Sequence, residues 1–320
     1  MFSLPDFKEK KVLFIHASSD MESQLKFSNS NLKLYRDGKL ENQISLHLLI
    51  SVFIIGEFTI TSYLIRQFKE HGISVFMLNH SFKYYASINS EAEGNTEIRN
   101  IQYLLPVEKQ LYFSKILMKN KVENQYSLIK KYLKKTPNFT LKSITDDIDN
   151  CRVYDSLLGI EGNVASKYFK QIFCDYDWYR RAPTTKEDIT NLLLDIGYSF
   201  LFNFTDSLLR LFGFDTYKGF YHKLYFQRKS LSCDIMEPMR ILIDKALLRA
   251  YSLNRIDEKD FKFKNGAFQF KDWDVQKKYL GIFSNAIMKN KDYIYGYVLD
   301  WYRFYHDQEK YSPPKFSIRL

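Results

Sequence analysis

One long amphipathic segment limits the folds open to this chain more than any other feature. Between positions 189 and 211, apolar residues recur every three or four positions for about six turns of helix. They are Ile189, Leu193, Ile196, Phe200, Phe204, Leu208 and Leu211. A helix with such a stripe needs other helices to bury it, so the pattern predicts a bundle. A second stripe, from Val122 to Leu133, supports a helical domain over residues 101–320.

The first ninety residues follow a strand pattern instead. Asp37-Gly38 lies between apolar residues and predicts a two-residue hairpin turn. Thr61 is expected to open a helix that runs to Glu70, with Gly72 ending it in a left-handed conformation. Apolar runs of strand length lie at 11–15, 50–55 and 73–78, of which 50–55 also fits a short helix.

These patterns predict an α+β fold with a small N-terminal β-rich domain and a larger all-helical C-terminal domain. We place the β-rich domain at residues 1–90 and the helical domain at 101–320. The polar segment 91–100 reads as the linker between them. Because the edges of a small sheet are open to pairing, the β-rich domain is the expected dimerisation surface.

Composition and charge restrict the functional classes. Lys and Arg number 47 against 37 Asp and Glu, and the net charge of +10 favours a polyanion as partner. The three cysteines are too few for a disulfide framework or a zinc knuckle. The N-terminus lacks a signal-peptide core, and polar residues interrupt the most apolar stretch, 44–58. We therefore expect a soluble, cytoplasmic protein.

One group of residues has the chemistry of a metal site. His222 is followed by Asp234 and Glu237, which are three positions apart, and Glu161 lies between two glycines before an expected helix start. Carboxylate-rich sites suit Mg²⁺ or Mn²⁺, and one imidazole favours Mn²⁺. A purely structural interpretation is also open. Asp234 and Glu237 would then complement a helix N-terminus, with Glu161 on the surface and His222 in the core.

Four motifs in the second half of the chain resemble the CRISPR-associated integrase and endonuclease family, "Cas-one". They are LLGIEGNVASKYF at 157–169, DIGYSFL at 195–201, GFDTYKGFYH at 213–222 and SLSCDIMEPMR at 230–240. The family shows the same order of Gly-Ile-Glu-Gly, Gly-Tyr, Gly-x-x-His and Asp-x-Met-Glu-Pro-x-Arg elements. The weaker resemblance outside these motifs extends over residues 11 to 250.

The resemblance implies a function and a set of site residues. Glu161, His222 and Glu237 match the family's metal ligands, and Asp234 would support them or serve as an alternative ligand. The implied reaction is metal-dependent joining of the 3′-hydroxyl ends of captured DNA fragments to a repeat array, with Mg²⁺ or Mn²⁺ bound. A metal-dependent, structure-selective nuclease in DNA repair is the alternative.

The resemblance also implies partners. They are double-stranded DNA, a second copy of the chain in a homodimer, and the small "Cas-two" protein bridging two dimers. Three basic residues that flank the site motifs are candidates for contacts with the strand near the site: Arg228, Lys229 and Arg240. For each of them, a solvated position without a DNA contact is the other interpretation. Arg66, Lys69 and Lys83 are weaker candidates for the path of the duplex. Tyr293, Tyr297 and Trp301 are predicted to pack as one helix face on the bundle, with stacking on unpaired bases as the alternative.

Overall fold

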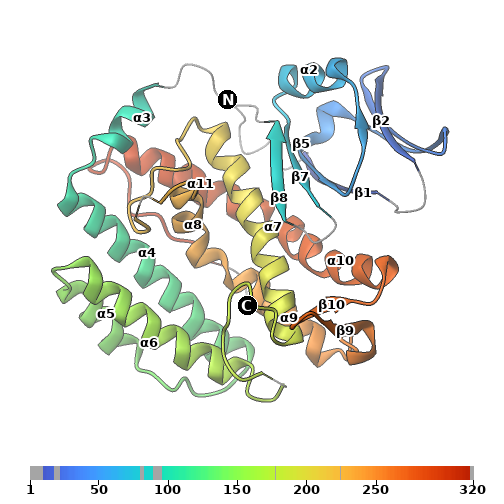
Figure 1. The fold of residues 1–320 in the computed structure, drawn as a ribbon. Coiled ribbons are helices and arrows are strands. Elements are labelled where there is room, and N and C mark those ends of the chain that lie inside the picture. The colour runs from blue at the N-terminus through green and yellow to red at the C-terminus, as the bar shows by residue number, and fades with distance from the viewer. Residues whose placement is uncertain are drawn as a thin grey trace.

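The computed structural model describes residues 10–17, 22–79, 83–88, 96–176, 178–223 and 225–317. In this part of the chain, an N-terminal β region precedes a predominantly helical region, which confirms the α+β class. Figure 1 shows the two regions side by side, with α7 (Ile189–Leu211) running along their junction.

Within the described residues, the strands of the β region form two small sheets. The first has the order β1-β5-β7-β8, in which β8 alone is antiparallel to its neighbour. The second has the order β4-β3-β2-β6. The first sheet consists of Lys11–His16 (β1), Leu49–Ile55 (β5), Ser74–Leu78 (β7) and Tyr84–Ile88 (β8). The second consists of Ser23–Ser28 (β2), Asn31–Arg36 (β3), Lys39–Ser45 (β4) and Thr59–Ile60 (β6).

Local signals in this region act as predicted. Asp37 and Gly38 connect β3 to β4 with φ of 45° and 74°, the left-handed values that a tight hairpin turn requires. The Thr61 hydroxyl accepts the amide of Leu64 at the start of α2 (Ser62–Glu70). Gly72 follows that helix with φ of 67°. Residues 50–55, for which strand and helix were both open, belong to strand β5.

The rest of the chain is mainly helical. The long helices are α4 (Val107–Ser127), α6 (Tyr154–Ile172), α7, α10 (Trp273–Lys289) and α11 (Lys291–His306). The shorter ones are α3 (Thr96–Tyr103), α5 (Leu141–Asn150), α8 (Ser230–Met236) and α9 (Ile241–Ser252). A π-turn at Leu128–Tyr132 follows α4, and a 3₁₀ turn at Glu237–Met239 joins α8 to α9.

The structure differs from the predicted organisation in two places. Of the predicted linker, residues 91–95 lie outside the described residues, whereas Thr96–Tyr103 forms helix α3. The C-terminal region also contains the hairpin β9 (Phe261–Lys264) and β10 (Ala267–Phe270), so it is not all-helical. The turn Asn265-Gly266, with φ of 57° and 77°, is the local cause. The division into domains at 1–90 and 101–320 stays a prediction.

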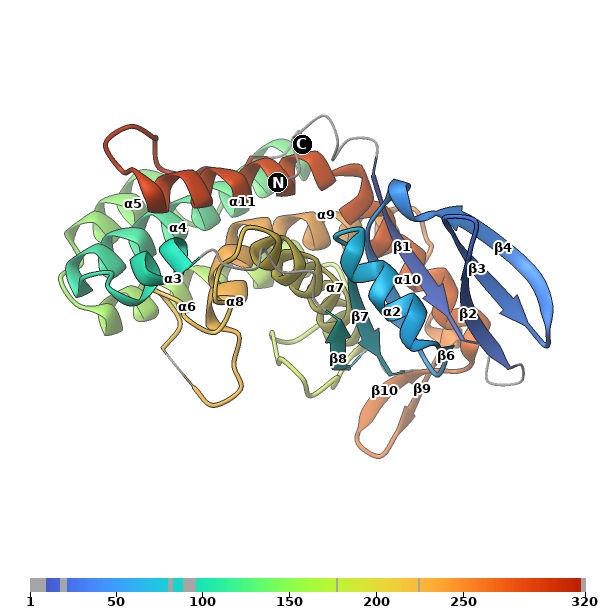
Figure 2. The ribbon, with the colours of Figure 1, turned by 90° about the horizontal axis from the view of Figure 1, so that it is seen from above.

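One hydrophobic core spans both regions. Phe14 and Phe53 of the first sheet stack with ring centroids 4.8 Å apart, and Phe200 of α7 lies 5.4 Å from Phe14. A second, smaller core lies between the two sheets and α2. Figure 2 shows the sheet strands lying across α7 and α10. The sheet therefore packs on the same helix whose stripe predicted a bundle, and α7 carries contacts on several faces.

Candidate active site

Glu161 lies in the middle of α6, not before a helix start as its flanking glycines had indicated. Gly159 and Gly162 both have helical backbone, so they do not interrupt the helix. Oε1 of Glu161 accepts a hydrogen bond from Lys121 Nζ at 2.5 Å, and Oε2 accepts one from the Tyr221 hydroxyl. The carboxylate is partly open to solvent, at 22% exposure. It is therefore held by the protein on one side and accessible on the other.

Glu237 is the second carboxylate at this point, and it is 2% exposed. It begins the 3₁₀ turn after α8, where its Oε2 lies 2.8 Å from Lys121 Nζ and its Oε1 lies 2.8 Å from Arg240 Nη2. Burial raises the pKa of Glu237, but the charges of Arg240 and Lys121 outweigh it and lower the pKa to about 2. Glu237 is thus an ionised, buried carboxylate between two cations.

Lys121 joins the two carboxylates. Its ammonium group contacts Glu161 at 2.5 Å and Glu237 at 2.8 Å, so one cation lies between residues that are far apart in sequence. The pairing of α4 with α6 and with the turn at Glu237 produces this meeting point. Sequence analysis missed Lys121. One signal was available in the sequence. Lys121 is four positions from both Leu117 and Gln125, and all three lie on the buried face of α4. A charged side chain on a buried face requires a counterion, so this spacing indicates an ion pair.

Asp234, which is fully buried, contacts both the ring and the backbone of His222. Oδ1 of Asp234 lies 2.6 Å from His222 Nδ1 and also accepts the His222 backbone amide at 2.9 Å. Its Oδ2 accepts the amides of Phe220 and Tyr221 at 2.7 and 2.9 Å. With Nδ1 directed at a carboxylate, the imidazole presents Nε2 as its other nitrogen. Asp234 thus fixes both the loop and the ring of His222.

Gly219 permits this close approach. A Cβ atom at position 219 would lie 2.6 Å from Asp234 Oδ2 and 2.9 Å from the Ser230 carbonyl carbon, closer than side chains come to such atoms. The second glycine of the motif before His222 is therefore needed so that the loop can lie against α8. The first, Gly213, has φ of 86° and ends helix α7.

A network of buried polar groups lies behind Glu237. The Arg240 guanidinium is 4.9 Å from the centre of the Tyr198 ring, and the Tyr198 hydroxyl donates to Asp244 at 2.5 Å. The Tyr168 hydroxyl donates to the other oxygen of Asp244 at 2.7 Å. Burial raises the pKa of Asp244 to about 6, against the opposing effect of these two hydrogen bonds. The network orients Arg240 toward Glu237.

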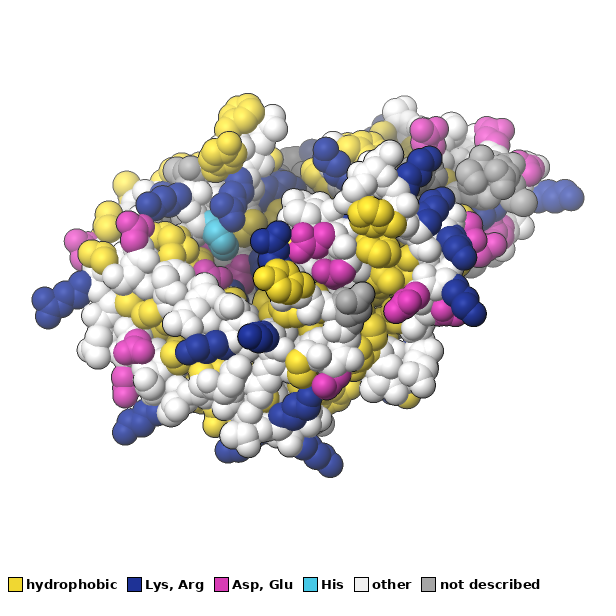
Figure 3. Space-filling view, turned by 60° about the horizontal axis from the view of Figure 1, so that its bottom comes forward, with side chains coloured by type: hydrophobic (Ala, Val, Ile, Leu, Met, Phe, Trp, Pro, Cys, Tyr) yellow, Lys and Arg dark blue, Asp and Glu magenta, His cyan; other side chains and the backbone are white. Residues whose placement is uncertain are grey.

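The three basic residues proposed to contact DNA lie in different environments. Arg228 is exposed on the loop before α8. Lys229 is buried, 2.9 Å from Asp206 Oδ2 and 4.4 Å from the centre of the Tyr84 ring, so its assignment as a strand contact is wrong. Arg240 is engaged by Glu237. Figure 3 shows Lys and Arg side chains around a histidine on the face that it presents. In helix α11, Tyr297 and Trp301 are buried as predicted, whereas Tyr293 is 46% exposed.

The structure brings Glu161 and Glu237 together, because both carboxylates contact Lys121. Glu161 also accepts a hydrogen bond from Tyr221, which precedes His222 in the chain. As they stand, the described residues contain no group of three or more His, Cys, Asp or Glu side chains arranged to hold a metal ion. The ammonium group of Lys121 lies between the two carboxylates. The assignment of Glu161, His222 and Glu237 as ligands stays a prediction.

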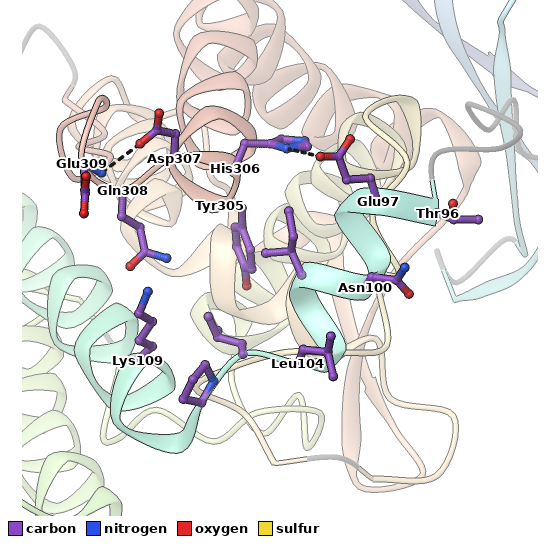
Figure 4. A pocket seen from close by; sticks show the side chains of 13 residues that line it. Thr96, Glu97, Asn100, Leu104, Lys109, Tyr305, His306, Asp307, Gln308 and Glu309 are labelled. Carbon is purple, nitrogen blue, oxygen red and sulfur yellow. Dashed lines mark hydrogen bonds and ion pairs between the residues drawn. The ribbon is translucent and has the colours of Figure 1, made fainter.

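A pocket of about 650 Å³ lies elsewhere, between α3, the start of α4 and the end of α11 (Figure 4). His306 and Glu97 form an ion pair at 3.8 Å on its wall, and Leu104 is largely exposed at its edge. None of the predicted site residues lines this pocket.

In the described part of the chain, no helix has both the length and the apolar character needed to cross a membrane.

Comparison with known proteins gives the family. The model of the family "CRISPR associated protein Cas1" matches residues 18–284, which is more than half of the 320 residues. A CRISPR-associated endonuclease Cas1 of Thermodesulfovibrio yellowstonii is 28% identical over 253 residues, which cover 74% of this chain and 80% of the relative.

Solved structures show the same fold. A casposase bound to its integration product superposes with a TM-score of 0.82 at 20% identity, over 97% of this chain and 96% of the casposase. A Cas6-RT-Cas1–Cas2 complex contains a region that superposes with a TM-score of 0.78 at 22% identity, over 98% of this chain and 36% of that one. At these identities the structures establish the fold alone. The match of the family model over most of the chain shows that the protein belongs to the Cas1 family of CRISPR-associated endonucleases.

Proposed function

We propose that this chain is the integrase of CRISPR adaptation, and that Glu161, Glu237 and His222 hold a catalytic Mg²⁺ or Mn²⁺. The observation that carries the proposal is the convergence of two carboxylates on a single cation, Lys121 Nζ, at 2.5 and 2.8 Å. Beside them, Asp234 holds the His222 ring by Nδ1. Two anionic oxygen donors and one imidazole are a donor set that suits these ions.

The residues fit such an ion. Oε2 of Glu237 is buried and faces a cation, the ammonium of Lys121, at 2.8 Å. Ionised carboxylate oxygens are the donors that Mg²⁺ and Mn²⁺ prefer, so a metal ion would take the place of this ammonium. The pKa of about 2 keeps Glu237 ionised at neutral pH, as a ligand must be. When bound, the ion supplies Lewis-acid polarisation of a phosphate oxygen.

The chain's own residues position and hold the reactants. The reaction exchanges one phosphodiester bond for another. The 3′-hydroxyl oxygen of a captured fragment forms a bond to phosphorus at the repeat border, and the bond to the repeat's 3′-oxygen breaks. The attacking hydroxyl gives up its proton, and the departing 3′-oxygen takes up a proton and leaves as a hydroxyl. Glu161 and Glu237 provide negative charge, Asp234 fixes His222, and the exposed Arg228 lies on the adjoining loop to meet a phosphate.

Partners follow from the same family. The structural neighbours include a Cas1–Cas2 complex and a casposase bound to an integration product, which supports DNA and the small Cas2 protein as partners of this chain. The net charge of +10 also favours DNA. One site joins one strand, whereas a complete insertion needs two joins. The functional assembly is therefore a pair of homodimers, paired through the β region and bridged by Cas2.

The test is strand joining by the variant H222A. Joining of a labelled fragment to a plasmid that carries a repeat array, with Mn²⁺ and Cas2 present, should fall by about two orders of magnitude or more, because loss of a ligand or its support costs 10–100-fold or more. The fold should be retained, since the His222 side chain is partly exposed and its loop is held through backbone amides.

The matched control is H306A, in the pocket between α3 and α11, away from the carboxylates. It should join fragments at the rate of the unmodified protein. Joining by H222A at that rate would refute the site assignment. Two-ended insertion by the chain without Cas2 would refute the bridging role alone.

A further inference from the structure

We propose that Lys121 is a built-in counterion of the carboxylate pair, which a divalent cation must displace in order to bind Glu161 and Glu237. The proposal rests on the metal site of the proposed function. It goes beyond that site because it gives a role to a positioning residue that is neither a carboxylate nor a histidine, and that sequence motifs do not mark.

The position of Lys121 is that of a buried ion rather than a surface lysine. Its side chain is 8% exposed, and its ammonium lies between oxygens of Glu161 and Glu237. The buried charge of Lys121 is thus compensated by these two carboxylates.

The other cation of the site has a separate place. Arg240 contacts the opposite oxygen of Glu237, Oε1, and lies over the Tyr198 ring. A cation held by Glu161 and Glu237 would compete with Lys121, which contacts both carboxylates, whereas Arg240 contacts only Glu237 of the two and would keep its place. Because like charges repel strongly at such distances, Lys121 and a dication cannot share the two carboxylates. Its flexible four-carbon stem allows the ammonium to move away.

The proposal makes two predictions of opposite sign. Without the ammonium, Glu161 and Glu237 face each other with less neutralising charge, so the metal-free protein becomes less stable. The same loss removes the competitor, so metal binding becomes tighter. A lysine with a structural role only would weaken metal binding together with the fold. A lysine that binds phosphate would leave both quantities unchanged.

The experiment uses the full chain with K121Q, which keeps a polar side chain and removes the charge. Free Mn²⁺ is measured by electron paramagnetic resonance during titration, and thermal unfolding is followed in EDTA. We expect K121Q to bind Mn²⁺ at least about tenfold more tightly and to unfold at a lower temperature in EDTA. The control is K119Q, which breaks the more exposed Lys119–Asp149 pair on the same helix and should bind Mn²⁺ as the unmodified protein does.

A second measurement needs no variant, in case K121Q does not fold. Lysines of the unmodified protein are labelled with trace acetic anhydride and quantified by mass spectrometry, with and without Mn²⁺. Labelling of Lys121 should rise several-fold when Mn²⁺ binds, whereas that of Lys119 should not change. Mn²⁺ binding with unchanged Lys121 reactivity, or equal affinity in K121Q, would overturn this proposal and leave the metal site intact. Absence of Mn²⁺ binding altogether would overturn both.

Discussion

At the scale of single residues, the buried side chain of Asp244 is expected to make the stability of the fold depend on pH. Its side chain is 2% exposed and accepts hydrogen bonds from Tyr168 and Tyr198. With a pKa of about 6, against 3.8 for an exposed aspartate, the folded protein binds a proton more readily than the unfolded chain does. A raised carboxyl pKa therefore contributes stability at low pH, and that contribution is lost as the pH rises through about 6.

The variant D244N should remove this dependence. Between about pH 4.5 and about pH 7.5, the free energy of unfolding of the unmodified protein should fall by about 2 kcal/mol more than that of D244N. Urea denaturation at the two pH values measures this difference. An asparagine at 244 still presents an oxygen to one tyrosine and a donor to the other, so the network keeps its hydrogen bonds. Parallel pH profiles for the two proteins would contradict the prediction.

The site residues divide into those that motifs reveal and those that they do not. Glu161, His222, Asp234 and Glu237 could be predicted because the family resemblance marks them, although spacing alone left a structural interpretation open. Lys121 and Tyr221 could not, because they meet Glu161 only through the packing of α4 and the 219–222 loop against α6. Such contacts depend on tertiary structure. The spacing of Lys121 among buried positions indicates that it needs a counterion, but it does not indicate which carboxylates provide it.

At the scale of elements, Gly197 determines how closely α7 approaches its neighbours. A Cβ at this position would lie 2.9 Å from Cδ1 of Phe283 in α10 and closer still to the Ile243 side chain in α9. Both of those side chains are fully buried, so neither can move away freely. The glycine of the Gly-Tyr motif is therefore a packing residue that lets three helices meet.

The variant G197A should lower the free energy of unfolding by about 1–3 kcal/mol through overpacking. The matched control is G281A in α10, where an added Cβ has no neighbour within 4 Å. That change should raise the free energy of unfolding by about 0.5–1 kcal/mol, since alanine favours a helix over glycine. Urea denaturation measures both. A stabilising effect of G197A would show that the three helices can separate without cost.

Most elements could be predicted where the local signal and the tertiary environment agree. The Asp37-Gly38 hairpin, the Thr61 helix and the long helix at 189–211 are examples. Prediction failed at 261–270, where an Asn-Gly turn between alternating residues carried the hairpin signal inside a region expected to be helical. It also failed at 96–100, where polar composition obscured the amphipathic helix α3, whose Ile98 and Gln102 are buried.

At the scale of the whole molecule, the shared core makes the β region and the helical region interdependent. Phe53 of β5 lies 6.4 Å from Phe200 of α7 and stacks on Phe14, and these rings belong to the same core as the helices around the site. The face of the sheet opposite this core packs on the second sheet and α2. The sheet is thus buried on both faces and belongs to both cores of the described residues.

The charge of the molecule leads to a final prediction, about DNA binding. With a net charge of +10, we expect duplex binding with little sequence preference and a steep dependence on salt, because each neutralised phosphate releases counterions. In R228Q, the slope of log affinity against log salt should become less steep by about one. Fluorescence anisotropy with a labelled duplex between roughly 50 and 200 mM salt measures the slope. The control is K39Q, which removes a charge from the start of β4, a strand that lies far from α8 in Figure 2. Equal slopes for R228Q and K39Q would show that the loop beside His222 does not contact the backbone, and affinity insensitive to salt would refute the electrostatic account as a whole.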